Sequence, residues 1–479
     1  MINKTFPNLA SHSSTSEFSA SELSSTPQRL QIYNEIDFIE SLKIAKEKGY
    51  KLTISSEKNA DDDLITSNYN YIQIENKMNK ILEINIKEEY TIVESGVTWV
   101  ELLIELDKYN YTILSCQSGL TFSIGGSFCG NVHGKKTKTP MVKDSVIQFE
   151  YINGLGRKIK VTNNEYIFNA FPGSLGLLGF ITNLKIKIQK KYGIITKIKT
   201  LPFNNESLNY INNLSKDTNI SMLNFKCSHF EKIQEILLTV FYYQNCIELE
   251  EINISLFNEH IKIYYTLIVI IFWAMSKTEI FDELRWNIEK NTILSLYNPN
   301  CINVNNSFDT WTKVYINKFK IIEFFFPMES FIYCQKTMMR IFSNNNMNIL
   351  SSGSRIIFEQ QTLPNSFSEF NTSVLSTPLS LQKNPGFLRF SQYASKEKPY
   401  ISLVVNFIED ENRMDNITNE IREHIIKKNI KLTYHTTYSW NFKKEDIEFM
   451  FPEIKNFFLI KLRNDPYNLF SNKFSEKYL

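Results

Sequence analysis

This sequence is poor in the features that mark several common protein classes. Six cysteines occur in 479 residues, with no CxxC pair and no histidine nearby at metal-ligand spacing, so neither a disulfide framework nor a metal site is predicted. The 53 basic residues nearly balance 51 acidic ones and form no dense stripe, which argues against a nucleic-acid partner. The first residues lack the basic start and apolar run of a signal peptide. We therefore expect reduced core thiols and a cytoplasmic protein. The six cysteines are Cys116, Cys129, Cys227, Cys246, Cys301 and Cys334.

Long apolar runs are also absent. The most apolar stretch, YYTLIVIIFWAM at residues 264–275, is well short of the roughly 20 residues that a helix needs to cross a bilayer. We interpret it as a buried helix or strand. The alternative is a lipid-facing surface, which would give the protein peripheral contact with the inner membrane face and access to a membrane-borne substrate.

The chain is long enough for two or three cores, since single domains usually stop growing at roughly 250 to 300 residues. Residues 1–27 are rich in Ser and Thr and are expected to form a flexible tail. Residues 28–191 open with a strand, an amphipathic helix and a second strand, and contain a hairpin that turns at residues 153–156. Residues 192–430 alternate aromatic-rich strands with helices, and residues 431–479 form a C-terminal segment. The predicted class is α+β, with an antiparallel sheet in the second half.

Two glycine-rich segments stand out in the first half. The first glycine segment, GLTFSIGGSFCGNVHG at residues 119–134, is followed by KKTK. The second glycine segment, GSLGLLG at residues 173–179, leads into a strand. Glycines allow a backbone to approach a flat or phosphorylated ligand and to offer amide donors without lysines. Glycine is also common in ordinary turns, which is the alternative for each segment taken alone.

The order of these motifs resembles a known family. SGVTWVELLIEL, SIGGSFCGNVHG, KDSVIQFEYINGLGRKIKV and FNAFPGSLGLLGFITNLKI are similar to the second half of the FAD-binding domain of vanillyl-alcohol-oxidase-type (PCMH-type) flavoproteins. IIEFFFPMESF and the DPYNLF tail are similar to decaprenylphosphoryl-ribose 2-oxidase and to the aldonolactone and alditol oxidases. The resemblance implies a two-subdomain FAD-binding domain at residues 28–191, a substrate cap at residues 192–430 and a C-terminal segment that returns to the flavin.

The resemblance also implies site residues. Contacts with FAD, expected to be non-covalent, would come from Gly119, Ser123, Gly125, Gly126, Asn131, His133, Gly134, Lys135, Gly173, Gly176, Gly179 and Ile181. His133 and Lys135 would lie beside the flavin ring and the substrate, where a cation stabilises the charge of a reduced flavin. The alternatives are a turn histidine that bonds the backbone and a solvated lysine.

On the cap side, Glu323 and Arg463 are candidates to face the substrate. Glu323 lies in an otherwise apolar strand, where a lone buried carboxylate is costly and needs a partner or a catalytic role, such as that of a base. An exposed strand edge is its alternative. Arg463 stands two residues before Asp465, and its alternative is an ion pair with that residue or a partner role at a helix end.

The implied reaction is hydride transfer from a CH–OH carbon of a sugar, sugar lactone or polyprenyl-phosphosugar to flavin N5, with oxygen, a quinone or a partner reductase as the electron acceptor. One departure from the family motivates a second hypothesis. The family's first glycine-rich loop corresponds here to SSEKNADDD at residues 55–63, which has no glycine and no histidine. The alternative is therefore a non-catalytic member of the fold that has lost flavin and acts as a binding protein.

Overall fold

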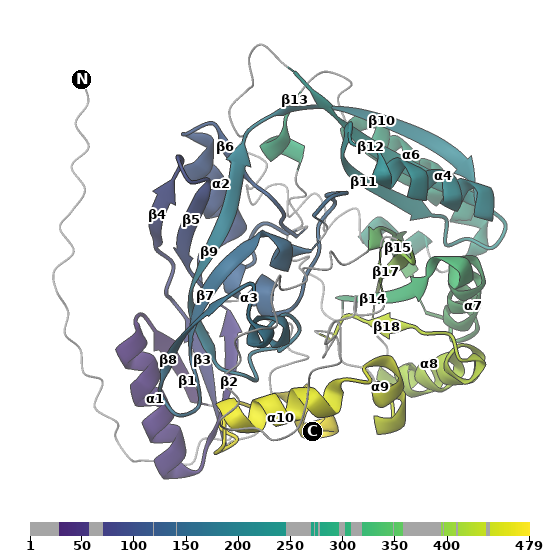
Figure 1. Cartoon of the computed structure of the whole chain (residues 1–479). Coiled ribbons are helices and arrows are strands. Elements are labelled where there is room, and N and C mark those ends of the chain that lie inside the picture. The colour runs from purple at the N-terminus through teal and green to yellow at the C-terminus, as the bar shows by residue number, and fades with distance from the viewer. Residues whose placement is uncertain are drawn as a thin grey trace.

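The computed structural model places a sheet-rich N-terminal half against a second half of sheets with helices around them (Figure 1). The predicted tail (1–27), most of the 55–63 loop and most of 264–275 lie outside the described residues. The structure describes residues 28–56, 70–117, 119–139, 141–245, 270–272, 274–275, 278–296, 302–307, 319–347, 349–357, 394–395, 397–408, 411–436 and 441–479.

The chain begins with a small parallel sheet. Strands β1 (Gln28–Ile32), β3 (Tyr71–Asn76) and β2 (Lys51–Ser56) lie in that order, and α1 (Glu35–Lys48) connects β1 to β2. The side chain of Asn34 caps the first turn of α1, and Gly49 ends the helix in the left-handed conformation at φ 68°. The predicted opening of strand, helix and strand is confirmed.

An antiparallel sheet follows. Its strands β4 (Ile81–Asn85), β5 (Tyr90–Glu94), β9 (Phe180–Lys190), β7 (Val146–Ile152) and β8 (Lys158–Thr162) lie in that order, and β6 (Tyr111–Ile113) also pairs with β9. The β7–β8 hairpin with its turn at residues 153–156 is confirmed. The segments that connect these strands along the chain contain helices α2 (Trp99–Asp107) and α3 (Ile124–Cys129) and the 3-10 turns Val142–Ser145 and Tyr166–Ala170.

In the part that the structure describes, the second half forms two further antiparallel sheets. The first has the order β11 (Ile220–Cys227), β12 (Glu235–Gln244), β10 (Gly193–Pro202) and β13 (Ile302–Asn303). The second, called the cap sheet here, has the order β15 (Ile349–Gly353), β17 (Tyr400–Ile408), β14 (Phe319–Pro327) and β18 (Thr433–Tyr434), with β16 (Ile356–Ile357) paired to β17. This arrangement confirms the α+β class.

Helices accompany both of these sheets. Figure 1 shows α4, α6, α7 and α8 along the outer side of the second half. Among the described residues, no helix combines the length and apolarity that a membrane span requires. Among the described residues before the C-terminal segment, the helices and 3-10 turns of this half include α4 (Asn205–Lys216), Glu279–Phe281, α6 (Asp282–Leu296), Val304–Ser307, Met328–Ser330, α7 (Phe331–Asn344), α8 (Glu411–His424) and Ile426–Lys428.

The C-terminal segment crosses back to the first sheet. It forms α9 (Lys444–Met450), α10 (Ile454–Asn464) and α11 (Lys473–Tyr478), with the predicted interruption at Pro452. Phe470, between α10 and α11, forms a parallel bridge with Leu52 of β2. Figure 1 shows α10 running beneath the two halves of the molecule.

Strand β14 packs into the main core through one of its two faces. Ile322, Phe324 and Phe326 belong to the main core, which also contains Phe331 of α7. Glu323 points the opposite way, because alternate residues of a strand face opposite sides of its sheet. The four cysteines in the described part of the chain carry free thiols, and Cys116, Cys227 and Cys334 are buried.

Candidate cofactor and active site

The first glycine segment contains glycines of two kinds. A Cβ atom at Gly125 would lie 2.8 Å from the backbone oxygen of Ser95, and one at Gly134 would lie 2.1 Å from that of Cys116. These two glycines are required because other parts of the protein pack on them. Gly126 is exposed, and its amide donates to the side chain of Ser123, the N-cap of α3. Of these three glycines, only Gly126 therefore lies at the surface, where a ligand could approach its backbone.

Asn131 follows α3 in the left-handed conformation at φ 52°. Its side chain is buried, and neither its amide oxygen nor its amide nitrogen has a hydrogen-bond partner. Buried polar groups are nearly always paired, so an unpaired carboxamide is unusual. Asn131 therefore fits the expectation that this segment contacts a bound ligand.

The second glycine segment joins the first. The amides of Gly173 and Leu175 both donate to the carbonyl of Cys129, at 2.9 and 3.2 Å. Gly176 has φ 76°, and a Cβ atom there would lie 3.3 Å from Ile54 of β2. The two glycine segments and β2 thus meet, although no local sequence pattern required it.

The remaining predicted cofactor contacts are spread around this junction. Gly119 has φ 105°, a conformation that favours glycine. Gly179 has φ 150° and lets the chain pass Ile152, whose carbonyl would lie 2.6 Å from a Cβ atom. Ile181 is buried, and its carbonyl accepts a hydrogen bond from Ser95 Oγ. The exposed backbone at Gly126 and the unpaired carboxamide of Asn131 are the features here that fit a bound FAD without any lysine.

His133 and Glu323 connect the two halves of the molecule. His133 Nε2 lies 2.8 Å from Glu323 Oε1, and the side chains are 4% and 9% exposed. His133 belongs to the first glycine segment and Glu323 to β14 of the cap sheet. The predicted candidates from the two halves are therefore direct partners, and the exposed-edge alternative for Glu323 is wrong.

Two residues that the sequence did not single out complete this group. Arg355, between β15 and β16, places Nη1 at 3.4 Å from His133 Nδ1. His435 follows β18 and donates its backbone amide to the carbonyl of Glu323 at 3.0 Å. Arginine has only donors, so a hydrogen bond in this contact would have Nδ1 as its acceptor, with Nε2–H donating to Glu323.

The electrostatics of the group follow from burial and charge. Burial raises the pKa of Glu323, but the attraction and hydrogen bond of His133, with smaller effects of His435 and Arg355, lower that pKa overall to about 2. Burial lowers the pKa of His435 to about 4, although Glu323 opposes this change. At neutral pH the group therefore contains an ionised carboxylate and a neutral His435.

The two lysines after His133 are both buried. Lys135 lies with Nζ 5.7 Å from the ring centre of Phe241, and its carbonyl accepts from Leu223 at 2.9 Å. The solvated-charge alternative for Lys135 is thus wrong. Lys136, which the sequence did not single out, hydrogen-bonds Tyr192 Oη, and burial lowers its pKa to about 8.

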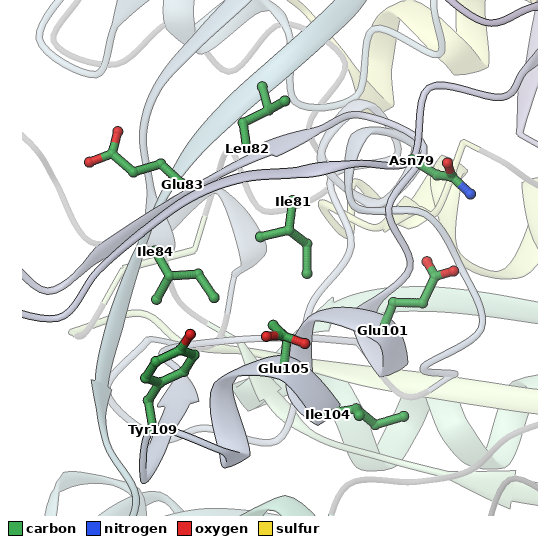
Figure 2. A pocket seen from close by; sticks show the side chains of 9 residues that line it. All are labelled: Asn79, Ile81, Leu82, Glu83, Ile84, Glu101, Ile104, Glu105 and Tyr109. Carbon is green, nitrogen blue, oxygen red and sulfur yellow. The ribbon is translucent and has the colours of Figure 1, made fainter. Parts of the chain in front are cut away.

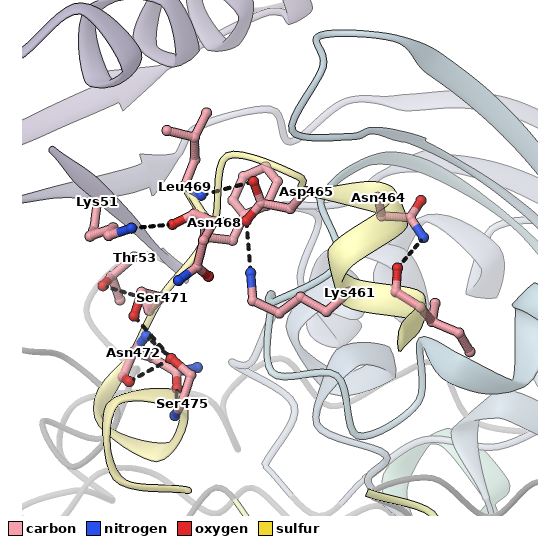
Figure 3. Close-up of polar contacts among 12 residues, drawn as sticks. Lys51, Thr53, Lys461, Asn464, Asp465, Asn468, Leu469, Ser471, Asn472 and Ser475 are labelled. Atoms are coloured by element: carbon pink, nitrogen blue, oxygen red, sulfur yellow. Dashed lines mark hydrogen bonds and ion pairs between the residues drawn. The ribbon is translucent and has the colours of Figure 1, made fainter. Parts of the chain in front are cut away.

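Arg463 does not join the buried group. Its side chain is exposed on α10, so the structure gives no support to a role facing the substrate. The alternative ion pair with Asp465 is also wrong, because Asp465 binds Lys461 Nζ at 2.7 Å (Figure 3). Arg463 does lie in the last turn of α10, which agrees with the helix-end alternative. Lys461 stands one helical turn before Asp465, which is the i,i+4 spacing at which helix side chains meet.

A separate groove of about 580 Å³ lies between β4 and α2 (Figure 2). Ile81, Ile84 and Ile104 contribute apolar walls, and Glu83, Glu101 and Glu105 contribute carboxylates. None of its lining residues belongs to either glycine segment or to the His133–Glu323 group. The groove is therefore not part of the predicted flavin site.

Comparison with known proteins identifies the N-terminal domain. Residues 30–162 match the family described as an FAD binding domain. Cytokinin dehydrogenase 3 of Oryza sativa subsp. japonica is 31% identical over 104 residues, which cover 21% of this chain and 20% of that protein. L-gulonolactone oxidase of Mus musculus is 20% identical over 158 residues, which cover 33% of this chain and 36% of that protein. The aligned part thus spans only about a fifth to a third of these relatives.

The whole fold is similar to a solved structure. Cholesterol oxidase from Brevibacterium sterolicum superposes with a TM-score of 0.65 over 94% of both chains at 13% identity, and a mutant of it superposes with a TM-score of 0.66. The predicted architecture of a PCMH-type FAD-binding domain with an antiparallel-sheet cap is thereby confirmed. The N-terminal domain is an FAD-binding domain, and FAD is the cofactor.

Proposed function

We propose that this protein is an FAD-linked oxidoreductase that oxidises a CH–OH group of a sugar, a sugar lactone or a polyprenyl-phosphosugar. The observation that carries the proposal is the buried His133–Glu323 pair, which brings an acid–base group of the cap to the glycine segment of an FAD-binding domain. FAD bound there supplies a hydride acceptor at flavin N5. L-gulonolactone oxidase and cholesterol oxidase, by their names, act on a lactone and on an alcohol.

We assign His133 as the group that accepts the hydroxyl proton. A carboxylate with a pKa of about 2 is a weak proton acceptor at neutral pH, so Glu323 is less suited to be the base itself. Glu323 instead holds the ring through Nε2–H and stabilises the imidazolium once Nδ1 is protonated, as a buried carboxylate does for a catalytic histidine elsewhere. The 3.4 Å contact between Arg355 and Nδ1 is longer than a strong hydrogen bond, so a substrate hydroxyl can replace it.

The remaining parts of the proposal concern cofactor attachment and partners. Gly126, Asn131 and Gly176 would hold FAD non-covalently, with Lys135 near the ring. The family loop that carries a linking histidine in some relatives has none here, at residues 55–63. We also propose a cytoplasmic location, with peripheral contact at the inner membrane face if the substrate is lipid-linked, and oxygen, a quinone or a reductase as the electron acceptor.

Anaerobic mixing of the purified protein with alditols, aldonolactones and polyprenyl-phosphosugars tests the proposal. We expect one of these classes to bleach the flavin bands. His133→Gln should slow bleaching most, because it removes the proton acceptor. Glu323→Gln should slow it less, and Glu329→Gln, an exposed change near the end of the same strand, should have no effect. A yellow protein that none of the three substrate classes reduces would contradict the proposed activity.

The second candidate is a flavin-free binding protein with this fold. It is favoured by one observation, the absence of glycine from residues 55–63, where the family has a glycine-rich loop. A purified protein that is yellow, or that takes up added FAD, rules this candidate out. A colourless protein that takes up none would support it.

A further inference from the structure

The C-terminal tail, residues 461–472, is held by a buried carboxylate. Asp465 is fully buried and accepts hydrogen bonds from Lys461 Nζ at 2.7 Å and from the amides of Leu469 and Phe470 at 2.8 Å each (Figure 3). These contacts reverse the chain after α10. A buried ion pair whose partner is removed leaves an uncompensated charge, so Lys461 and Asp465 depend on each other.

The reversal places the tail along the edge of the first sheet. The amide of Leu52 donates to the carbonyl of Leu469 at 2.7 Å, and the amide of Ser471 donates to the carbonyl of Leu52 at 2.9 Å. Thr53 Oγ1 also donates to the carbonyl of Ser471, at 2.8 Å. Strand β2 lies at one edge of the order β1-β3-β2, so the tail covers an edge that would otherwise be unpaired.

The same tail contacts the second glycine segment and the β7–β8 turn. Asn472 Nδ2 donates to the carbonyl of Leu175 at 3.1 Å. The amide of Gly154 donates to the carbonyl of Asn464 at 2.8 Å, and a Cβ atom at Gly154 would lie 2.5 Å from Asp465 Oδ1. Only a glycine, which has no Cβ atom, lets the turn approach the ion pair this closely.

These contacts lie where β2 meets the second glycine segment, which is part of the predicted cofactor site. Leu175 is bonded to the end of α3 and precedes Gly176, which lies against Ile54 of β2. The tail bonds both β2 and Leu175, so it fixes the distance between the two subdomains of the FAD-binding domain on either side of Gly176. No other described segment of the second half is hydrogen-bonded to β2.

We propose that the Lys461–Asp465 pair is a positioning element for FAD: it folds the C-terminal tail so that β2 and the second glycine segment are held in the arrangement that binds the cofactor. The inference rests on FAD being the cofactor. It assigns no contact between Lys461 or Asp465 and FAD. Its consequence is that a change at the far end of the chain weakens cofactor binding without touching the cofactor.

The test compares three variants of the full-length protein after FAD removal. Lys461→Met breaks the ion pair, Thr53→Val removes one bond between β2 and the tail, and Lys455→Met is the matched control because Lys455 is exposed on the same helix. FAD affinity is measured by fluorescence titration. Amide exchange is measured for β2 and, as an internal reference, for β17.

We expect the FAD dissociation constant of Lys461→Met to rise about tenfold, equivalent to about 1.4 kcal/mol, with faster exchange in β2 and unchanged exchange in β17. Thr53→Val should show the same pair of effects at smaller size, so the test does not depend on Lys461→Met folding. Faster β2 exchange with unchanged FAD affinity would overturn the proposal and leave the tail as a structural brace. A wild-type protein that takes up no FAD would overturn the cofactor assignment itself, an outcome that the titration reveals independently of the exchange data.

Discussion

Replacement of Glu323 by glutamine is the most informative single change in this protein. Glutamine keeps the size of the side chain and an oxygen that can accept from His133 Nε2–H, but it has no charge. It therefore mimics the protonated carboxyl group. The variant should fold. The difference between its unfolding free energy and that of the wild type should report the electrostatic stabilisation of the carboxylate alone.

The size of the expected loss of stability follows from the lowered pKa of Glu323. Each tenfold change in acid strength corresponds to about 1.4 kcal/mol, so a pKa lowered from 4.5 to about 2 corresponds to about 3 kcal/mol of stability. A carboxyl group whose pKa is lower in the folded state stabilises the fold fully above its unfolded value of 4.5 and loses this contribution as pH falls toward 2. At pH 3 about 1 kcal/mol should remain.

Urea unfolding of the wild type and of Glu323→Gln at pH 7 and pH 3 measures this difference. We expect a loss of about 3 kcal/mol at pH 7 that shrinks by more than half at pH 3. Glu329→Gln changes an exposed carboxylate in the 3-10 turn just after β14 and should be within about 0.5 kcal/mol of the wild type at both pH values. Equal destabilisation by Glu323→Gln at both pH values would show that the carboxylate is not held by charge, and the reasoning would be wrong.

Three further outcomes are expected. Gly126→Leu should abolish FAD content but leave the melting temperature of the apoprotein nearly unchanged, because Gly126 is exposed; loss of the fold would contradict this. Gly134→Ala should destabilise the protein by about 1–3 kcal/mol or more, since its Cβ would lie 2.1 Å from the Cys116 carbonyl; an unchanged urea midpoint would refute it. His435 has a folded pKa of about 4, below its ordinary 6.5, so it stabilises the fold above pH 6.5 and loses that contribution as pH falls toward 4. His435→Gln should flatten the dependence of unfolding free energy on pH in that window, and a slope equal to the wild type would count against a buried neutral imidazole.

Local signals in the sequence were sufficient to predict much of the fold. Thr98 and Glu101 form a reciprocal capping box at the start of α2, a pattern visible as T-x-x-E. The turn at residues 153–156 ends with Gly156 at φ 74°, where glycine is favoured. Both features depend on residues a few positions apart, so the sequence contains everything needed to predict them.

The candidate site was predictable only in part. His133 and Glu323 were each expected, but they lie 190 residues apart, and only the packing of β14 against the first glycine segment brings them together. Arg355 and His435 were missed because each stands at the end of a short strand, where no periodic pattern marks it. For Arg355 the available signal was a lone charged residue beside the apolar pair Ile356 and Ile357, which is the kind of argument that identified Glu323.

Arg463 shows how a correct motif can lead to the wrong residue. Arg463 was expected to face the substrate, and an ion pair with Asp465 was one of its alternatives. In a helix, side chains meet at i,i+4 and not at i,i+2, so Lys461 is the partner and Arg463 faces solvent. Helical phase alone would have given the correct assignment.

The central claim is that the glycine segments of the N-terminal domain hold FAD beside the His133–Glu323 pair. The visible spectrum of the purified protein, recorded before and after acid precipitation, tests it most directly. The account predicts the two visible flavin bands, with the yellow colour released into the supernatant because FAD is bound non-covalently. A colourless protein that also fails to take up added FAD would contradict the account.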